Sequence, residues 1–329
     1  MKIITPPKLY LDTNHLCSIT KVRSGRHSVL PPKFQDAYAV LNSLIVQGRV
    51  GLIFQMMAAL EWVGGDATLD SAYEIADVFE TAPLSYQVEG DTFVFTAELL
   101  NECHRLQPFL KVPQFDVFWS RGASTVIQPA IFVLSKVAPD VFHLSDATIS
   151  PTTLPHGNVP VRLAVERAFN LKSNDPKLYL ERIEGFATAM ANDFEAIRNR
   201  TVKRYTGTDF REWAVRYLSI DRILKALNPA VSISDVLSAI QCDSPAFEKH
   251  CPATALFLKY RLKKLQETRR VKKGDVGDAE FLQVVPFSDF VLTDRSHRHF
   301  VVEADPTLRH KVYSDPNEVV ACLHKVGLH

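Results

Sequence analysis

The sequence predicts an α/β fold in which a central parallel sheet flanked by helices is interrupted by a mostly helical region. Three observations indicate this class. Short apolar runs alternate with helical periods over residues 8 to 90, and the same alternation returns near the end of the chain. Long helical patterns fill the residues between these two parts. Strands that alternate with helices indicate βαβ units, and the strands of such units run parallel.

The first α/β part begins with an apolar run, Lys8 to Leu11, that follows two prolines and ends in Asp12-Thr13-Asn14. This pattern is typical of a buried strand that leads into a turn. Apolar side chains at helical spacing predict a helix over residues 34 to 47, and Gly48 is expected to stop it. The next predicted elements are, in order, a strand at Val50 to Phe54, a short helix at Gln55 to Val63, a helix over 66 to 80 and a strand at Leu84 to Val88.

The later elements define the predicted domains. The run from Asp289 to Asp294 repeats the opening pattern of an apolar strand that ends in an acid. A short strand at His310 to Tyr313 and a final helix from Pro316 are expected after it. We therefore predict one α/β domain in two parts, residues 1–91 and 255–329, separated by a helical insertion over residues 92–254.

The composition is that of an ordinary soluble globular protein. Of the 329 residues 46% are hydrophobic and 23% are charged, and the formal net charge is +1. The five cysteines are scattered and form no C-x-x-C pair, so neither a disulfide framework nor a zinc site is indicated. We expect a cytoplasmic protein with no membrane partner, because the sequence shows no secretory signal pattern and no apolar run of about 18 residues.

Four acids are placed where they can carry chemistry. Asp12 and Asp294 end predicted strands, Glu61 lies in an apolar helix, and Asp278 precedes another apolar helix. The carboxyl ends of parallel strands meet at one edge of a sheet, where ligands bind. Carboxylates gathered there repel one another, and a divalent cation is the usual means of keeping them ionised together. Mg²⁺ or Mn²⁺ suits such an oxygen site and can activate water for hydrolysis.

These acids and their neighbours resemble the four acidic motifs of the PIN-domain nucleases, in the order that this family has them. The matching segments are Leu9-Tyr10-Leu11-Asp12-Thr13-Asn14, Ala59-Leu60-Glu61-Trp62, Gly277-Asp278-Ala279-Glu280 and Val291-Leu292-Thr293-Asp294. The resemblance covers roughly residues 8 to 90 and 255 to 329. It implies a PIN-like fold and a metal-dependent nuclease, with a ribonuclease as the first expectation. PIN domains are usually compact, so the helical insertion departs from the family's pattern.

The resemblance also implies roles for individual residues. Asp12, Glu61, Asp278 and Asp294 would be catalytic metal ligands for Mg²⁺ or Mn²⁺, and Asp275, one helical turn before Asp278, can supply a fifth carboxylate. Three neighbouring side chains would orient carboxylates or water from a second shell. They are Thr13, Asn14 and Thr293.

A basic cluster precedes Asp275 and is the predicted nucleic-acid contact. An apolar stripe in the same stretch places the basic side chains on the other faces of a helix and in the loop after it. Such a surface can hold phosphates beside a metal site, with RNA expected in preference to DNA. A plain solvated helix face remains an alternative. The residues proposed to bind nucleic acid are Lys263, Lys264, Arg269, Arg270, Lys272 and Lys273.

Other interpretations stay open at this level. Asp12 and Asp294 can act as ordinary helix N-caps after their strands, which would make the chain a non-catalytic PIN-like RNA-binding or scaffold protein. His297 and His299 are two residues apart and do not share a helix face, so a joint metal site is not expected. The insertion can serve as a lid, as a partner surface or as a contact between copies of the chain. Phosphate-loop, dinucleotide, serine-hydrolase and zinc-protease motifs are absent.

Overall fold

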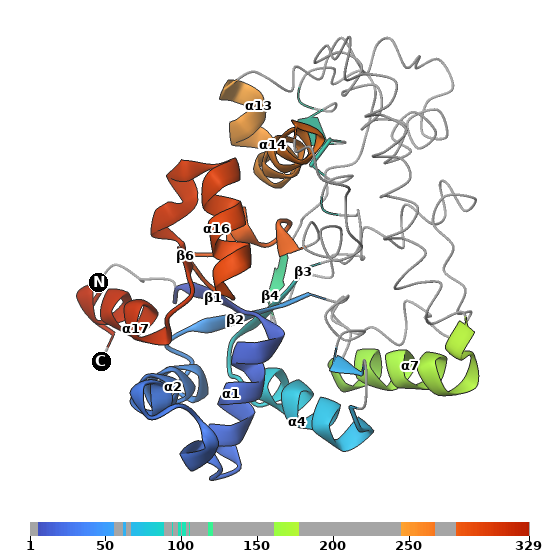
Figure 1. Ribbon diagram of the computed structural model, residues 1–329, viewed down its shortest axis with the longest axis vertical. Coiled ribbons are helices and arrows are strands. Elements are labelled where there is room, and N and C mark those ends of the chain that lie inside the picture. The colour runs from blue at the N-terminus through green and yellow to red at the C-terminus, as the bar shows by residue number, and fades with distance from the viewer. Residues whose placement is uncertain are drawn as a thin grey trace. The chain divides into compact units, whose positions relative to one another are not determined.

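Figure 1 shows a computed structural model of the chain. The structure describes residues 6–55, 62–63, 67–88, 94, 98–99, 101–102, 105, 118–120, 161–177, 245–266 and 281–328. The chain divides into two compact units. The first consists of Met1–Val88, Val159–Phe186 and Val284–His329, and the second of Glu89–Asn158 and Ala187–Gln283.

The first unit has the α/β composition expected from the sequence, and its elements alternate along the chain. In order they are β1 (Lys8–Leu11), α1 (Thr13–Arg23), η1 (His27–Val29), α2 (Pro32–Val46), β2 (Gly51–Gln55), α4 (Leu69–Glu80), β3 (Ser85–Val88), α7 (Val161–Asn174), η5 (Val285–Phe287), β5 (Phe290–Leu292), α16 (Arg295–Ala304), η6 (Pro306–His310), β6 (Val312–Tyr313) and α17 (Pro316–Lys325).

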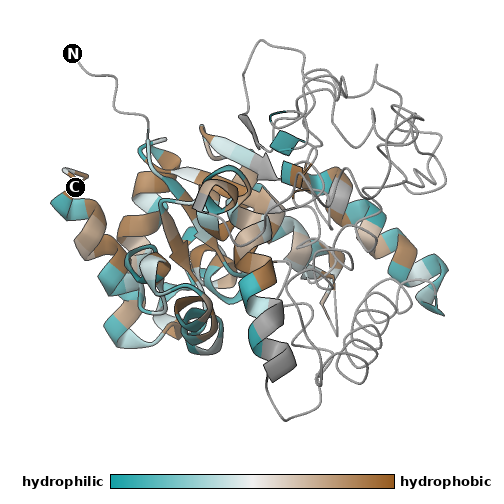
Figure 2. Cartoon of the chain, turned by 90° about the horizontal axis from the view of Figure 1, so that it is seen from above, coloured by the Kyte–Doolittle hydropathy of each residue, from teal (hydrophilic) through white to brown (hydrophobic). Residues whose placement is uncertain are grey.

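Five strands of the first unit form a parallel sheet in the order β3-β2-β1-β5-β6. The predicted α/β class with a parallel sheet is therefore confirmed. β1 lies at the centre, with Tyr10 opposite Ile53 of β2 and opposite Val291 of β5. The side chains of β1 and β5 are almost entirely buried, as expected when helices cover both faces of a parallel sheet. Figure 2 shows hydrophobic residues, in brown, gathered along these strands.

Local sequence signals account for the helix ends. α2 has Pro32 at its first position, where a missing N–H costs nothing, and Gly48 follows the helix with a φ of 66° that favours glycine. The predicted stop at Gly48 is thus confirmed. α4 begins with a capping box in which the side chains of Thr68 and Ser71 each accept from the backbone N–H of the other residue.

Helix α7 belongs to the first unit, although the sequence analysis assigned it to the insertion. The reason is its packing on α4. Val161 and Val165 join the hydrophobic core, the Tyr73 hydroxyl donates to Glu166 at 2.8 Å, and Arg162 Nε donates to Asp77 at 2.9 Å. The first predicted boundary, after residue 91, lies close to the observed end of the first segment at Val88.

The described parts of the second unit include β4 (Phe118–Ser120), α13 (Pro245–His250) and α14 (Pro252–Gln266). Almost all of α14 falls within the predicted second α/β part, 255–329, whereas the structure assigns this helix to the second unit. Glu98 is fully buried here, and its carboxylate accepts from the backbone N–H groups of Ala253 and Thr254 at the start of α14. None of the helices in the described residues has the length and apolarity needed to span a membrane.

Candidate functional site

The pairing of β1 with β5 brings two of the predicted acids to one edge of the sheet. Leu11 lies opposite Leu292 in the register, so Asp12 and Thr293 leave the sheet side by side. The backbone N–H of Asp12 donates to the Leu292 carbonyl at 3.0 Å, and that of Thr293 donates to the Tyr313 carbonyl at 3.0 Å. The ends of both strands are therefore held by the sheet, which fixes where the side chains of Asp12 and Asp294 begin.

Asp12 directs its carboxylate across the sheet. It occupies the N-cap position of α1, but its side chain makes no capping hydrogen bond. Instead Oδ2 accepts from the Thr293 hydroxyl at 3.0 Å and lies 3.5 Å from Nδ1 of His297. Burial raises the pKa of Asp12, but contact with His297 and the hydrogen bond from Thr293 outweigh it. The pKa lies below its usual value, so the carboxylate is charged at neutral pH.

Asp294 divides its two oxygens between the backbone and the site. Oδ1 caps α16, because it accepts from the backbone N–H of His297 at 2.8 Å and from the Ser296 hydroxyl at 2.7 Å. Oδ2 lies 3.4 Å from Nδ1 of His297. Burial raises the pKa of Asp294, but the hydrogen bonds from His297 and Ser296 lower it by more, so the pKa lies below its usual value.

His297 completes the group and was not among the predicted site residues. Its Nδ1 is close to both carboxylates and 3.2 Å from the Thr293 hydroxyl. The signal was present in the sequence, because a residue three positions after a helix-capping Asp lies in the first helical turn above it. His299, by contrast, is 74% exposed and pairs with Glu303 at 3.1 Å, so the two histidines do not share a site, as expected.

A buried histidine, His15, makes hydrogen bonds near this edge of the sheet. His15 of α1 is 9% exposed, and its Nδ1 is 2.6 Å from the hydroxyl of Tyr38 on α2. The imidazole also makes a hydrogen bond to the backbone of Thr293. Burial lowers the pKa of His15, although the Thr293 backbone and the two acids oppose that shift. The neutral ring therefore links α1 and α2 to the loop that carries Asp294, a role that no sequence pattern indicates.

The predicted second-shell residues have different positions. Thr293 contacts both Asp12 and His297, which fits its predicted role. Asn14 is exposed on α1, and among the described contacts its side chain makes no hydrogen bond to either acid. Thr13 lines a pocket next to the site.

Several predicted residues lie outside the described part of the chain. This is the case for Glu61, Asp275 and Asp278, and for four members of the basic cluster, Arg269, Arg270, Lys272 and Lys273. Lys263 and Lys264 lie on α14 in the second unit, where Lys263 is half-buried. The proposed roles of all these residues stay predictions.

The donor set of the described residues fits a divalent cation. One oxygen each from Asp12 and Asp294 and Nδ1 of His297 all lie within 4.8 Å of one another. Ligands that are 2.0 to 2.6 Å from one ion can be at most about 5 Å apart, so no large rearrangement is needed. Carboxylate oxygens suit Mg²⁺ and Mn²⁺, and transition-metal ions accept an imidazole nitrogen more readily than Mg²⁺ does. The set therefore favours Mn²⁺ over Mg²⁺.

Comparison of the chain with known protein families, with curated proteins and with solved structures finds no significant match. The resemblance to PIN-domain nucleases therefore depends on the four motifs alone.

Proposed function

We propose that the chain is a divalent-metal-dependent nuclease with a PIN-like α/β domain, and that RNA is its substrate. One observation carries the proposal. Asp12 and Asp294, which are far apart in the sequence, leave neighbouring parallel strands at the same edge and approach the same imidazole nitrogen. This is the place where parallel sheets bind ligands, and two ionised carboxylates there favour a cation.

The side chains of the site have separable tasks in this proposal. Asp12 and Asp294 provide negative charge, and the Thr293 hydroxyl holds one Asp12 oxygen so that the other remains available. His297 offers Nδ1 between the two acids. A bound Mg²⁺ or Mn²⁺ would supply an activated water and stabilise charge on the phosphodiester. Glu61, Asp278 and Asp275 are expected to complete the ligand set, and the basic cluster is expected to hold phosphates.

A second candidate function is favoured by a specific observation. Oδ1 of Asp294 caps α16 through two hydrogen bonds, which is the structural role that a non-catalytic protein would require. In that case the chain would be an RNA-binding or scaffold protein, and the site would hold no ion. Asp12 is the discriminating residue, because its side chain makes no capping bond to its own helix.

Cleavage of matched single-stranded RNA and DNA by the full chain tests the proposal. We expect cleavage of RNA with Mn²⁺ or Mg²⁺, none in EDTA, and a loss of more than about 100-fold in Asp12→Asn. Asp289→Asn is the matched control. Its carboxylate accepts from the Lys8 backbone N–H at 2.7 Å just before β5, at the opposite end of that strand. Equal cleavage by Asp12→Asn and wild type, or cleavage that survives EDTA, would contradict the proposal.

A further inference from the structure

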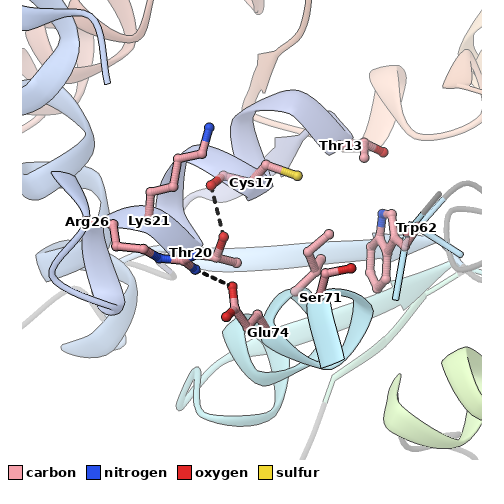
Figure 3. A pocket seen from close by; sticks show the side chains of 10 residues that line it. Thr13, Cys17, Thr20, Lys21, Arg26, Trp62, Ser71 and Glu74 are labelled. Carbon is pink, nitrogen blue, oxygen red and sulfur yellow. Dashed lines mark hydrogen bonds and ion pairs between the residues drawn. The ribbon is translucent and has the colours of Figure 1, made fainter. Parts of the chain in front are cut away.

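A pocket of about 330 Å³ lies between helices α1 and α4 of the first unit. Figure 3 shows its two walls. Thr13, Cys17 and Lys21 come from successive turns of α1, and Ser71 and Glu74 come from α4. The volume is within the range of small-molecule sites. Because Thr13 follows Asp12 directly, one end of the pocket adjoins the pair of acids.

The two ends of the pocket differ in charge. At one end Arg26 and Glu74 form an ion pair at 2.6 Å. Lys21 also lines this end, and Figure 3 shows its ammonium group pointing away from that pair, with no hydrogen bond or ion pair to any of the described residues. This end therefore carries a net positive charge. Toward the other end lies the Cys17 thiol, whose pKa is raised by burial, so the sulfur is uncharged at neutral pH.

Trp62 forms the wall at the uncharged end and has an unsatisfied donor. Its indole is 3% exposed and packs against Phe79 and Phe54, with ring centroids 5.6 and 5.5 Å apart. Nε1 has no hydrogen-bond partner among the described residues. In Figure 3 this nitrogen lies on the side of the ring that faces Thr13 and Cys17. A buried donor without an acceptor destabilises the folded chain, and a ligand that accepts from it would remove that cost.

We propose that this pocket binds one nucleotide of the substrate strand, with the base at the Trp62 end, accepting from Nε1, and a phosphate toward Lys21. The inference rests on the proposed nuclease function, because it explains why such a pocket adjoins Asp12. A nucleobase is planar, fits the volume and presents carbonyl or ring-nitrogen acceptors to a donor that has none. The positive end then favours a nucleotide over a free nucleoside.

Calorimetric titration of the full chain with uridine monophosphate in EDTA tests the pocket apart from catalysis. We expect a dissociation constant on the order of 0.1 to 1 mM, which is reasonable for a ligand of this size. Trp62→Phe keeps an aromatic ring against Phe54 and Phe79 but removes the N–H, so affinity should fall by roughly tenfold.

Two further arms keep the test decisive. Cys17→Leu fills the pocket from α1 without changing Trp62 and should abolish binding, which tests the pocket even if Trp62→Phe does not fold. Ribose 5-phosphate lacks a base and should bind no differently to Trp62→Phe and wild type. The inference would be overturned if uridine monophosphate did not bind to the wild type. It would also be overturned if Trp62→Phe and Cys17→Leu both bound this nucleotide as tightly as the wild type does.

The failure of the pocket and of the nuclease proposal are distinguishable. Asp12→Asn should keep its affinity for uridine monophosphate, because Asp12 does not line the pocket. Binding without metal-dependent cleavage would leave a nucleotide site without the proposed chemistry. If cleavage depends on metal but its KM is unchanged in both pocket variants, the nuclease proposal stands and the proposed nucleotide pocket is wrong.

Discussion

The two junctions at which β1 leads into α1 and β5 leads into α16 have the same pattern, an apolar strand followed by an Asp and a helix. Their acids nevertheless do different things. Asp294 uses one oxygen to cap its own helix, whereas Asp12 leaves its helix uncapped and contacts Thr293 and His297 across the sheet. The difference shows that an acid at a strand end is not assigned a role by its position alone. A cap and a ligand are told apart by which oxygens remain uncommitted.

The largest expected effect separates these two roles at Asp294. Serine is an N-cap comparable to Asp but has no carboxylate, so Asp294→Ser should keep α16 capped and lose the candidate ligand. We expect cleavage to fall by more than about 100-fold while the melting temperature stays close to that of wild type. Initial cleavage rates and thermal melts of the same preparation provide the measurement. If Asp294→Ser retains full activity, the cap is the only function of this side chain.

A metal ion bound by side chains from both junctions should stabilise the folded chain. If Asp12, Asp294 and His297 hold Mn²⁺, the metal stabilises the folded chain by about 2.7 kcal/mol at a free concentration 100 times its dissociation constant. The melting temperature of the wild type should therefore rise with Mn²⁺, whereas that of Asp12→Asn should not. Asp289→Asn is the control and should respond as the wild type does. An equal rise in Asp12→Asn would place the ion elsewhere.

The sequence predicts the part of this site that depends on strand ends. Asp12, Thr293 and Asp294 follow short apolar runs whose strand character is clear, and parallel strands bring such ends together. His297 was not predicted because only its spacing from His299 was considered. Its position in the first turn of the helix that Asp294 caps was not. His15 was missed for a different reason. Its contacts with Tyr38 and the Thr293 backbone come from α2 and from the residue after β5, and no local pattern records such long-range packing.

The division into units shows the same limit. The sequence indicates that residues 161 to 169 are helical, and α7 confirms it. It does not indicate which unit the helix joins, because that depends on Arg162 and Glu166 meeting partners on α4 more than 80 residues earlier. Helical periodicity reports one apolar face, and the identity of the surface that covers this face is a tertiary property.

Glu98 is a third carboxylate that contacts the start of a helix. Its effect on the stability of the folded chain should change with pH in the direction opposite to that of the two site acids. Burial raises its pKa to about 7, although hydrogen bonds from Thr254 and Ala253 oppose the shift. The folded chain then holds this proton more tightly than the unfolded chain does. Stability should therefore fall as the pH rises from about 4.5 to 7, and stay level above that.

Thermal melts of the full chain between pH 4.5 and 8 test this sign. In Glu98→Gln the decrease that this group causes, on the order of 5 °C, should disappear. Glu102→Gln is the matched control, since Glu102 is also buried in this segment but pairs with Arg105 at 2.7 Å. It should retain the decrease. A pH dependence that is identical in Glu98→Gln and wild type would show that folding does not raise the pKa of Glu98.

The smallest expected effect tests the comparison between the two junctions directly, without any assumption about activity. Asp294→Ala removes two hydrogen bonds to the first turn of α16 and should lower the free energy of unfolding by about 1 kcal/mol, the usual cost of losing an N-cap. Asp294→Ser should restore most of that loss. At the other junction the pattern should be different. Asp12 makes no capping bond, so Asp12→Ser should be no more stable than Asp12→Ala. Urea titration of the four variants measures these differences. A serine that rescues Asp12→Ala to the same extent would show that α1 gains as much from a side-chain cap at this position as α16 does, and the two junctions would then be equivalent in this respect.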